Sequence, residues 1–128
     1  MAYYFNRTVD LTFEAAIAKV TEELRKAGFG ILSDIDVTAA LKKKLGVDFR
    51  QYRILGACNP PFAYQALQAE DKIGVMLPCN VVVQEWAEGK VEVAAIDPVA
   101  SMQAVANDKL VDIAREIREK LQQVIRNI

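Results

Sequence analysis

Apolar side chains recur every three or four residues through the C-terminal part of the chain. From Leu110 to Ile125 they fall on one side of a helix with about 3.6 residues per turn, and the other side is largely charged. Asn107 or Asp108 stands just before them, where a short polar side chain can cap the helix. We therefore predict a long C-terminal helix with one face buried.

Three earlier segments also have the periodicity or the end signals of helices. Each is preceded by a residue that can accept a hydrogen bond from the free N–H groups of a first helical turn. Two of the segments end at a glycine. A short helical stretch is expected after Asp97, because Pro98 fits the first position of a helix. The predicted helices are residues 12–28, 36–46, 59–70 and 97–105.

The segments between these helices have the composition of β-strands. Residues 72–78 are apolar on both faces, which is typical of an interior strand. Residues 80–87 and 90–96 flank a glutamate–glycine pair and predict a β-hairpin. Further strands are expected at residues 3–9, 29–35 and 51–57.

These elements predict an α+β fold, built as a two-layer α/β sandwich in a single domain of residues 1–128. We expect a mixed β-sheet of about five to six strands, because strand–helix–strand crossovers and a hairpin occur in one chain. The helices should lie mainly on one face. The other face then needs a cover, so we expect a homodimer.

Charge and composition exclude several classes of partner. The formal net charge is -1, whereas general nucleic-acid binding needs a clear positive excess, so no nucleic-acid partner is expected. No apolar run approaches the roughly 18 residues of a membrane span, and the N-terminus lacks the pattern of an export signal. We therefore expect a cytoplasmic protein with no membrane partner and with reduced cysteines.

The absence of histidine is the most informative negative feature of the sequence. It excludes Ser-His-Asp and Cys-His nucleophilic sites and removes the commonest ligand of transition metals. Neither common glycine-rich phosphate signature occurs. The sequence therefore names no cofactor and leaves open whether the protein is an enzyme.

Two similar corners carry the remaining candidate chemistry. Cys58 and Asn59 lie where a predicted strand passes into a helix, and Cys79 and Asn80 follow a strand that ends at Pro78. A helix N-terminus can lower the pKa of a nearby thiol. If the two strands are parallel neighbours, both corners reach the same edge of the sheet. The sequence then predicts a site of two thiols and two amides.

This thiol–amide site suits a small ligand, a soft metal ion such as Cu(I) or Zn(II), or a reactive sulfur species. A metal would be bound by Cys58 and Cys79 and would need further donors from a second subunit, a ligand or water. A thiol-redox role needs the two Cα atoms within about 7 Å of one another.

The residues leave two alternatives open. In the first, the protein is an interaction or structural module, both cysteines are packing residues, and Asn59 is only a helix cap. In the second, it is a cysteine-dependent enzyme with Cys58 as the nucleophile and Asn59 and Asn80 as amide donors to an oxyanion. Without histidine, the base of that enzyme has to be a carboxylate, a lysine or the thiolate itself.

The sequence resembles one known family along nearly its whole length. The resemblance rests on the segments ILGACNPPFAYQAL (54–67), IGVMLPCNVVVQE (73–85), VEVAAIDP (91–98) and GFGILSDIDVTAALKKKLG (28–46). They are similar to the prokaryotic family known as domain of unknown function 302. The resemblance implies a small two-layer α/β domain that dimerises, and it implies no activity. It also places eight residues on motif positions: the site residues Cys58, Asn59, Cys79 and Asn80, and the supporting loop residues Gly56, Pro60, Pro78 and Asp97.

Overall fold

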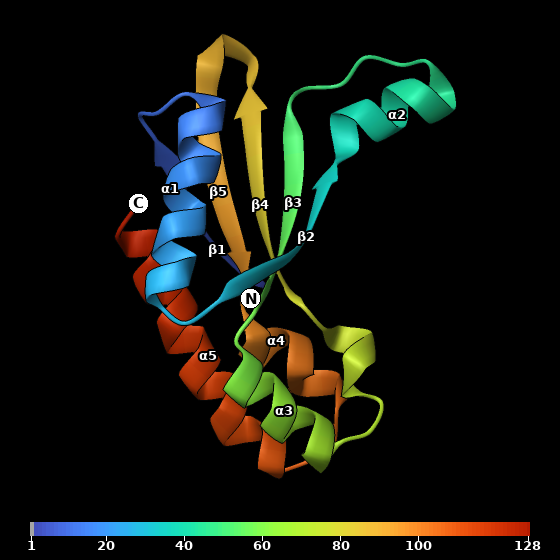
Figure 1. Cartoon of the computed structure of the whole chain (residues 1–128), viewed down its shortest axis with the longest axis vertical. Helices are drawn as coiled ribbons and strands as arrows, with labels where there is room; N and C mark the ends of the chain where they lie inside the picture. Colours follow the sequence, from blue (N-terminus) through green and yellow to red (C-terminus); the bar gives the residue numbers. More distant parts are fainter. Residues whose placement is uncertain (1) are drawn as a thin grey trace.

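An antiparallel sheet of five strands organises the part of the chain that the computed structural model describes, residues 2–128 apart from the side chain of Glu88 (Figure 1). The strand order is β1-β5-β4-β3-β2, so the first two strands of the chain form the two edges of the sheet. The strands are β1 (Tyr4–Val9), β2 (Gly30–Asp36), β3 (Tyr52–Cys58), β4 (Cys79–Trp86) and β5 (Lys90–Ile96).

Two long helices, α1 (Phe13–Lys26) and α5 (Lys109–Arg126), cover one face of this sheet (Figure 1). The second of them extends beyond the end of the strands, where it supports the shorter helices α3 and α4. In the described part of the chain, the opposite face of the sheet has no covering helix. The remaining elements are α2 (Val37–Leu45), α3 (Pro60–Ala69), α4 (Pro98–Ser101) and the 3₁₀ turns η1 (Ile73–Met76), η2 (Ala87–Gly89) and η3 (Met102–Ala104).

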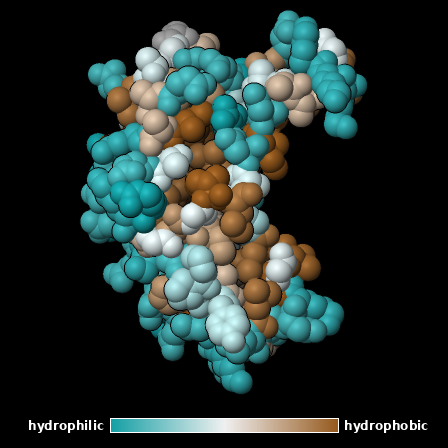
Figure 2. Space-filling model, viewed as in Figure 1, coloured by the Kyte–Doolittle hydropathy of each residue, from teal (hydrophilic) through white to brown (hydrophobic). Residues whose placement is uncertain are grey.

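Helix α2 projects from the body of the molecule (Figure 1), and none of its residues is buried. Thr38 fastens it to β3, because its hydroxyl donates to the carbonyl of Arg50 at 2.7 Å and accepts from the N–H of Tyr52 at 3.0 Å. Gly46 ends the helix at a φ of 69°, which favours glycine. Figure 2 shows the molecule hollowed between α2 and η1, with hydrophobic side chains along the hollow.

The hydrophobic core lies between the covered face of the sheet and the two long helices. Side chains of a strand alternate between its two faces, so every second residue of β3, β4 and β5 points toward the helices. Val81 and Val83 of β4 and Leu24 of α1 have no solvent exposure. The same cluster contains Leu55, Val91, Val93, Leu121 and Val124.

The structure confirms the predicted two-layer α+β fold with a C-terminal helix, and its five strands lie within the predicted number. The prediction of a mixed sheet is wrong, because all four strand pairings are antiparallel. The connection through α1 does cross a face, but it joins β1 and β2 at opposite edges of the sheet. The connections through α2 and α3 leave and return at one end of the sheet, which makes the strands they join antiparallel.

The strand predicted at residues 72–78 is also wrong. Residues 73–76 form the 3₁₀ turn η1 outside the sheet. Ile73 is buried in a second, smaller cluster with Ala66 and Leu110, whereas Val75 is 84% exposed. The apolar run therefore reflects packing against α3 and α5 rather than burial on both faces of a strand.

No helix within residues 2–128 combines the length and apolar character that a membrane crossing requires. The longest, α5, has 18 residues. Charged side chains occupy its outer side, among them Arg115, Glu116 and Glu119.

Replacing Leu24 by alanine should lower the free energy of unfolding by about 2 to 5 kcal/mol, because the buried side chain leaves a cavity. Urea denaturation followed by circular dichroism measures this loss. Leu45→Ala is the matched control, since Leu45 is 69% exposed, and surface substitutions usually change stability by about 0.5 kcal/mol or less. Equal losses in the two variants would contradict the position of the core.

Candidate functional site

The two cysteine corners lie beside one another where β3 ends and β4 begins. In the β3–β4 register Ala57 is opposite Cys79, so Cys58 follows directly at the position beside Pro78. The sequence predicts that the corners meet if their strands are parallel neighbours. The structure brings them together through an antiparallel pair, in which one strand ends where its neighbour starts.

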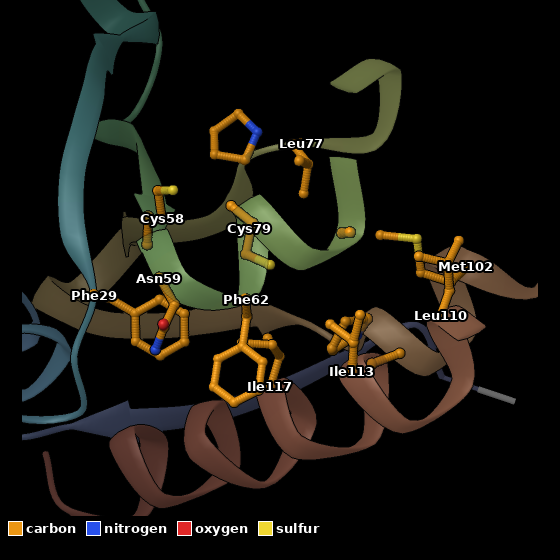
Figure 3. Close-up of a pocket in the computed structure, with 16 residues that line it drawn as sticks. Phe29, Cys58, Asn59, Phe62, Leu77, Cys79, Met102, Leu110, Ile113 and Ile117 are labelled. Carbon is orange, nitrogen blue, oxygen red and sulfur yellow. The ribbon is translucent and has the colours of Figure 1, made fainter. Parts of the chain in front are cut away.

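The side chains of Cys58 and Cys79 leave the backbone on opposite faces of the sheet. Ala57 and Cys79 are a cross-strand pair on the helix-covered face, and Cys58 is the next residue after Ala57. Figure 3 shows the Cys79 sulfur directed toward the apolar side chains above α5, while the Cys58 sulfur points in a different direction. Both cysteines are free thiols. A disulfide between them would require the end of β3 to rearrange, because a disulfide needs Cβ atoms that point toward each other.

Asn80 does not join the other three predicted site residues. It is opposite Gly56 in the register and is exposed on the uncovered face of the sheet. There it borders a shallow hollow with Tyr4 and Val82. The predicted cluster of two thiols and two amides is therefore reduced to Cys58, Asn59 and Cys79.

These three residues border an apolar cavity of about 70 Å³ between the end of the sheet, α3 and α5 (Figure 3). Phe62 of α3 and Ile113 and Ile117 of α5 point into it from opposite sides. Asn59 is the one side-chain amide among the lining residues. The rest of the lining is Phe29, Ala57, Ala63, Ala66, Leu77, Pro78, Pro98, Met102, Leu110 and Ala114.

Burial raises the pKa of the Cys79 thiol to about 11, and the nearby Cys58 contributes to the same shift. At neutral pH Cys79 is therefore a protonated, uncharged thiol. An apolar wall explains this state, because it cannot solvate a thiolate. Cys79 thus suits contact with an uncharged molecule better than nucleophilic attack.

The N-terminus of α3 offers few hydrogen-bond donors to an anion. Two of its first three residues, Pro60 and Pro61, have no N–H, and the N–H of Ala63 is bonded to the carbonyl of Asn59. The sequence predicts that the free N–H groups at this helix end lower the pKa of a cysteine. Most of those N–H groups are missing or already bonded.

Asn59 precedes α3, but its side chain does not cap the helix. The residue is only 8% exposed. Its amide nitrogen lies against the turn after α1, where a Cβ on Gly28 would be 3.1 Å away. Gly28 has a φ of 92°, so glycine is favoured there for its backbone as well. The Asn59 amide is thus held at the cavity wall rather than used as a cap.

Gly56 and Pro78 fix the geometry at the start of β4. A Cβ on Gly56 would lie 2.8 Å from Cγ of Pro78 and would overlap the hydroxyl of Ser33. Because Gly56 has no side chain, Pro78 can pack directly against β3. This contact positions Cys79, the next residue, against the cavity.

Asp97 supports the far wall of the cavity. Its carboxylate accepts a hydrogen bond from the N–H of Val99 at 3.0 Å, which caps α4, and lies 3.3 Å from Nε of Arg118 on α5. Asp97 is 5% exposed. Its role is to hold Pro98, a lining residue, against α5.

Sequence reasoning missed most of the cavity wall. Phe29, Phe62, Met102 and Ile113 have the spacing of ordinary core residues, so their pattern does not distinguish a filled core from a hollow one. Within residues 2–128, no group of three or more His, Cys, Asp or Glu side chains is arranged to hold a metal ion.

Comparison with known proteins agrees with the fold. Residues 5–128 match the family described as Domain of unknown function DUF302. The chain is also similar to a solved structure, the crystal structure of uncharacterized conserved protein DUF302 from Bacillus stearothermophilus, with a TM-score of 0.91 and 27% identity. That match covers 99% of this chain and 98% of the other. The curated proteins contain no match.

Alkylation of Cys79 should be slow at neutral pH and should accelerate about tenfold per pH unit until the pH nears 11, because the thiolate is the reactive form. Iodoacetamide labelling of Cys58→Ser, followed by mass spectrometry, isolates this thiol. Labelling after unfolding is the control for access. A rate that levels off below pH 9 would contradict a buried, uncharged Cys79.

The free energy of unfolding should fall as the pH rises from about 9 to 11. The unfolded chain releases the Cys79 proton at a lower pH than the folded chain does, so a higher pH favours the unfolded state. The loss amounts to at most about 2 to 3 kcal/mol. Denaturation curves measured at several pH values in this interval give the free energy of unfolding. This free energy should decline less steeply with pH for Cys79→Ala than for the wild type. Parallel declines would show that Cys79 titrates alike in both states.

Proposed function

This chain belongs to the family Domain of unknown function DUF302, and from the geometry of its cavity we propose that it binds a small, uncharged, predominantly apolar ligand beside Cys58 and Cys79. The observation that carries the proposal is the apolar cavity itself, whose lining includes Cys58, Asn59 and Cys79.

The size of the cavity limits the ligand. Its volume of about 70 Å³ is larger than the roughly 10 to 15 Å³ that one water molecule needs and smaller than the roughly 150 Å³ apolar cavities that accept benzene. A molecule of a few non-hydrogen atoms fits this space. Because the lining is almost entirely apolar, such a ligand gains by leaving water, whereas an ion would lose its hydration.

The thiols and the amide give the cavity its selectivity. Sulfur is polarisable and makes close contacts with other soft atoms, and Cys58, Cys79 and Met102 all border the space. Asn59 adds one group that can form a hydrogen bond with a polar end of the ligand. Small organic sulfur compounds, such as thiols and sulfides, match this combination. A reducing cytoplasm would keep both thiols in the form that the binding requires.

The same geometry gives less support to the other functions. A soft metal would have only two thiolates from this chain, and Cys79 would first have to lose its proton in an apolar wall. A cysteine nucleophile at Cys58 would rely on α3, whose N-terminus is occupied by two prolines. Asn80 is on the uncovered face and cannot serve as the second amide donor of that enzyme.

Dimethyl sulfide is a suitable probe, with acetate as the charged counterpart of similar size. We expect dimethyl sulfide to shift the methyl NMR signals of Met102, Ile113 and Ile117, and acetate to leave them unchanged. Replacing both cysteines by alanine should weaken binding several-fold while the protein stays folded.

Ala63→Leu provides the decisive variant, because Ala63 lines the cavity and a larger side chain fills it. Ala18→Leu is the matched control on the exposed side of α1. Binding should disappear in the first variant and persist in the second. Unchanged methyl signals in the wild-type protein, or equal binding by both variants, would exclude the proposed function.

A further inference from the structure

A second pocket lies directly beside the apolar cavity. This outer pocket is at the surface between η3 and the first turns of α5, and its volume is about 200 Å³. Met102, Leu110 and Ala114 line both the cavity and the outer pocket. Because the same three residues face both spaces, the cavity and the outer pocket are neighbours separated only by side chains.

Of the three residues in this partition, only Met102 has a side chain that can move aside. Ala114 carries a single methyl group, and Leu110 is 3% exposed in a buried cluster with Ile73. Met102 is half-buried, and its unbranched thioether side chain has three rotatable bonds. Figure 3 shows it beside Leu110, at the end of the cavity away from Cys58. The Met102 side chain is therefore the movable part of the partition.

The backbone of Met102, in contrast, is held on both sides. Its N–H donates to the carbonyl of Pro98, and its carbonyl accepts from the N–H of Val105 at 3.0 Å. The first bond closes the end of α4, and the second closes η3. Rotation of the side chain therefore opens the partition without unfolding either element, and its cost is confined to the contacts of one side chain.

The outer pocket continues the chemistry of the cavity. Val99, Val105 and Val111 supply apolar walls, Gln103 adds an exposed amide, and none of the described residues that line the pocket is charged. The side chain of Met102 is itself an unbranched chain, so the space that it vacates fits another unbranched chain and is too narrow for a branched one. An uncharged linear molecule can therefore extend from the cavity into the outer pocket.

From these observations we infer that the cavity and the outer pocket form one binding site for a linear, uncharged dialkyl sulfide, with the Met102 side chain as the gate between them. One end of the chain lies in the cavity beside Cys79, and the rest passes Met102 into the outer pocket. The inference rests on the proposed function and extends it, because the cavity alone holds only a few non-hydrogen atoms. Each further methylene that leaves water strengthens binding about fourfold.

The test compares a linear and a branched isomer, n-butyl methyl sulfide and tert-butyl methyl sulfide, with dimethyl sulfide as the short reference. Dimethyl sulfide should shift the methyl NMR signals of Ile113 and Ile117, which line the cavity alone. The linear isomer should also shift those of Val99, Val105 and Val111, which line the outer pocket alone. It should bind at least about tenfold more tightly than the branched isomer, since about two more methylenes are buried.

The outcomes separate this inference from the proposed function. If dimethyl sulfide binds and the linear isomer does not, or the linear isomer shifts only the cavity signals, the proposed function stands and the inference is wrong. If no sulfide binds, both are wrong. If the linear isomer shifts both sets of signals while dimethyl sulfide shifts none, the joined site is supported and binding in the cavity alone is excluded.

Met102→Ala tests the gate, because it removes the movable part of the partition. The passage is then wide enough for the branched isomer, so the preference for the linear isomer should fall toward equality. Met76→Ala is the matched control, since Met76 is also half-buried but lines neither space, and it should keep the wild-type preference. Far-UV circular dichroism verifies folding. A folded Met102→Ala that keeps the full preference, or a wild type without any preference, overturns the inference.

Discussion

The pairing of β3 with β4 is the constraint on which the rest of the site depends. Because Ala57 is opposite Cys79, the chain leaves the sheet and returns to it at one point. The residues between them cannot form another strand there and instead build α3 and η1 against α5. The cavity is the space that this excursion leaves beneath it. Gly56 permits the return, since a side chain there would collide with Ser33 and Pro78.

The same excursion determines the chemistry of the cavity. A wall built from α3 and α5 is apolar, because both helices turn their hydrophobic sides to it. An apolar wall keeps Cys79 uncharged. The prolines at the start of α3 remove donors that would otherwise favour an anion. The thiol, the amide and the apolar wall, on which the proposed binding of a neutral molecule rests, thus each depend on the local path of the chain.

Much of the fold could be predicted from the sequence, and much of the site could not. The periodicity from Leu110 to Ile125 is sufficient to identify α5, because one face of a helix repeats in sequence. The relative direction of neighbouring strands produces no such pattern in the sequence, so the sequence prediction of a mixed sheet is wrong. The strand predicted at residues 72–78 is wrong for a related reason. Ile73 is apolar because it packs against Leu110, and the sequence does not show which residue an apolar side chain packs against. The position of Asn80 directly after Cys79 predicts that it joins the cysteines, yet adjacent residues of a strand face opposite sides of the sheet.

The position of β1 at the edge of the sheet affects how the chain assembles. β2, β3 and β4 each pair with the next strand in the sequence, so these contacts can form as the chain lengthens. β1 can pair only after β5 has been made, since Tyr4 pairs with Ile96. Closing so long a loop slows folding. Until β5 is made, β1 has no strand to pair with, whereas α1 can already pack against β2 and β4. The newly synthesised chain therefore leaves its first strand unpaired longest, and in that interval this strand is most open to association with chaperones or with other nascent chains.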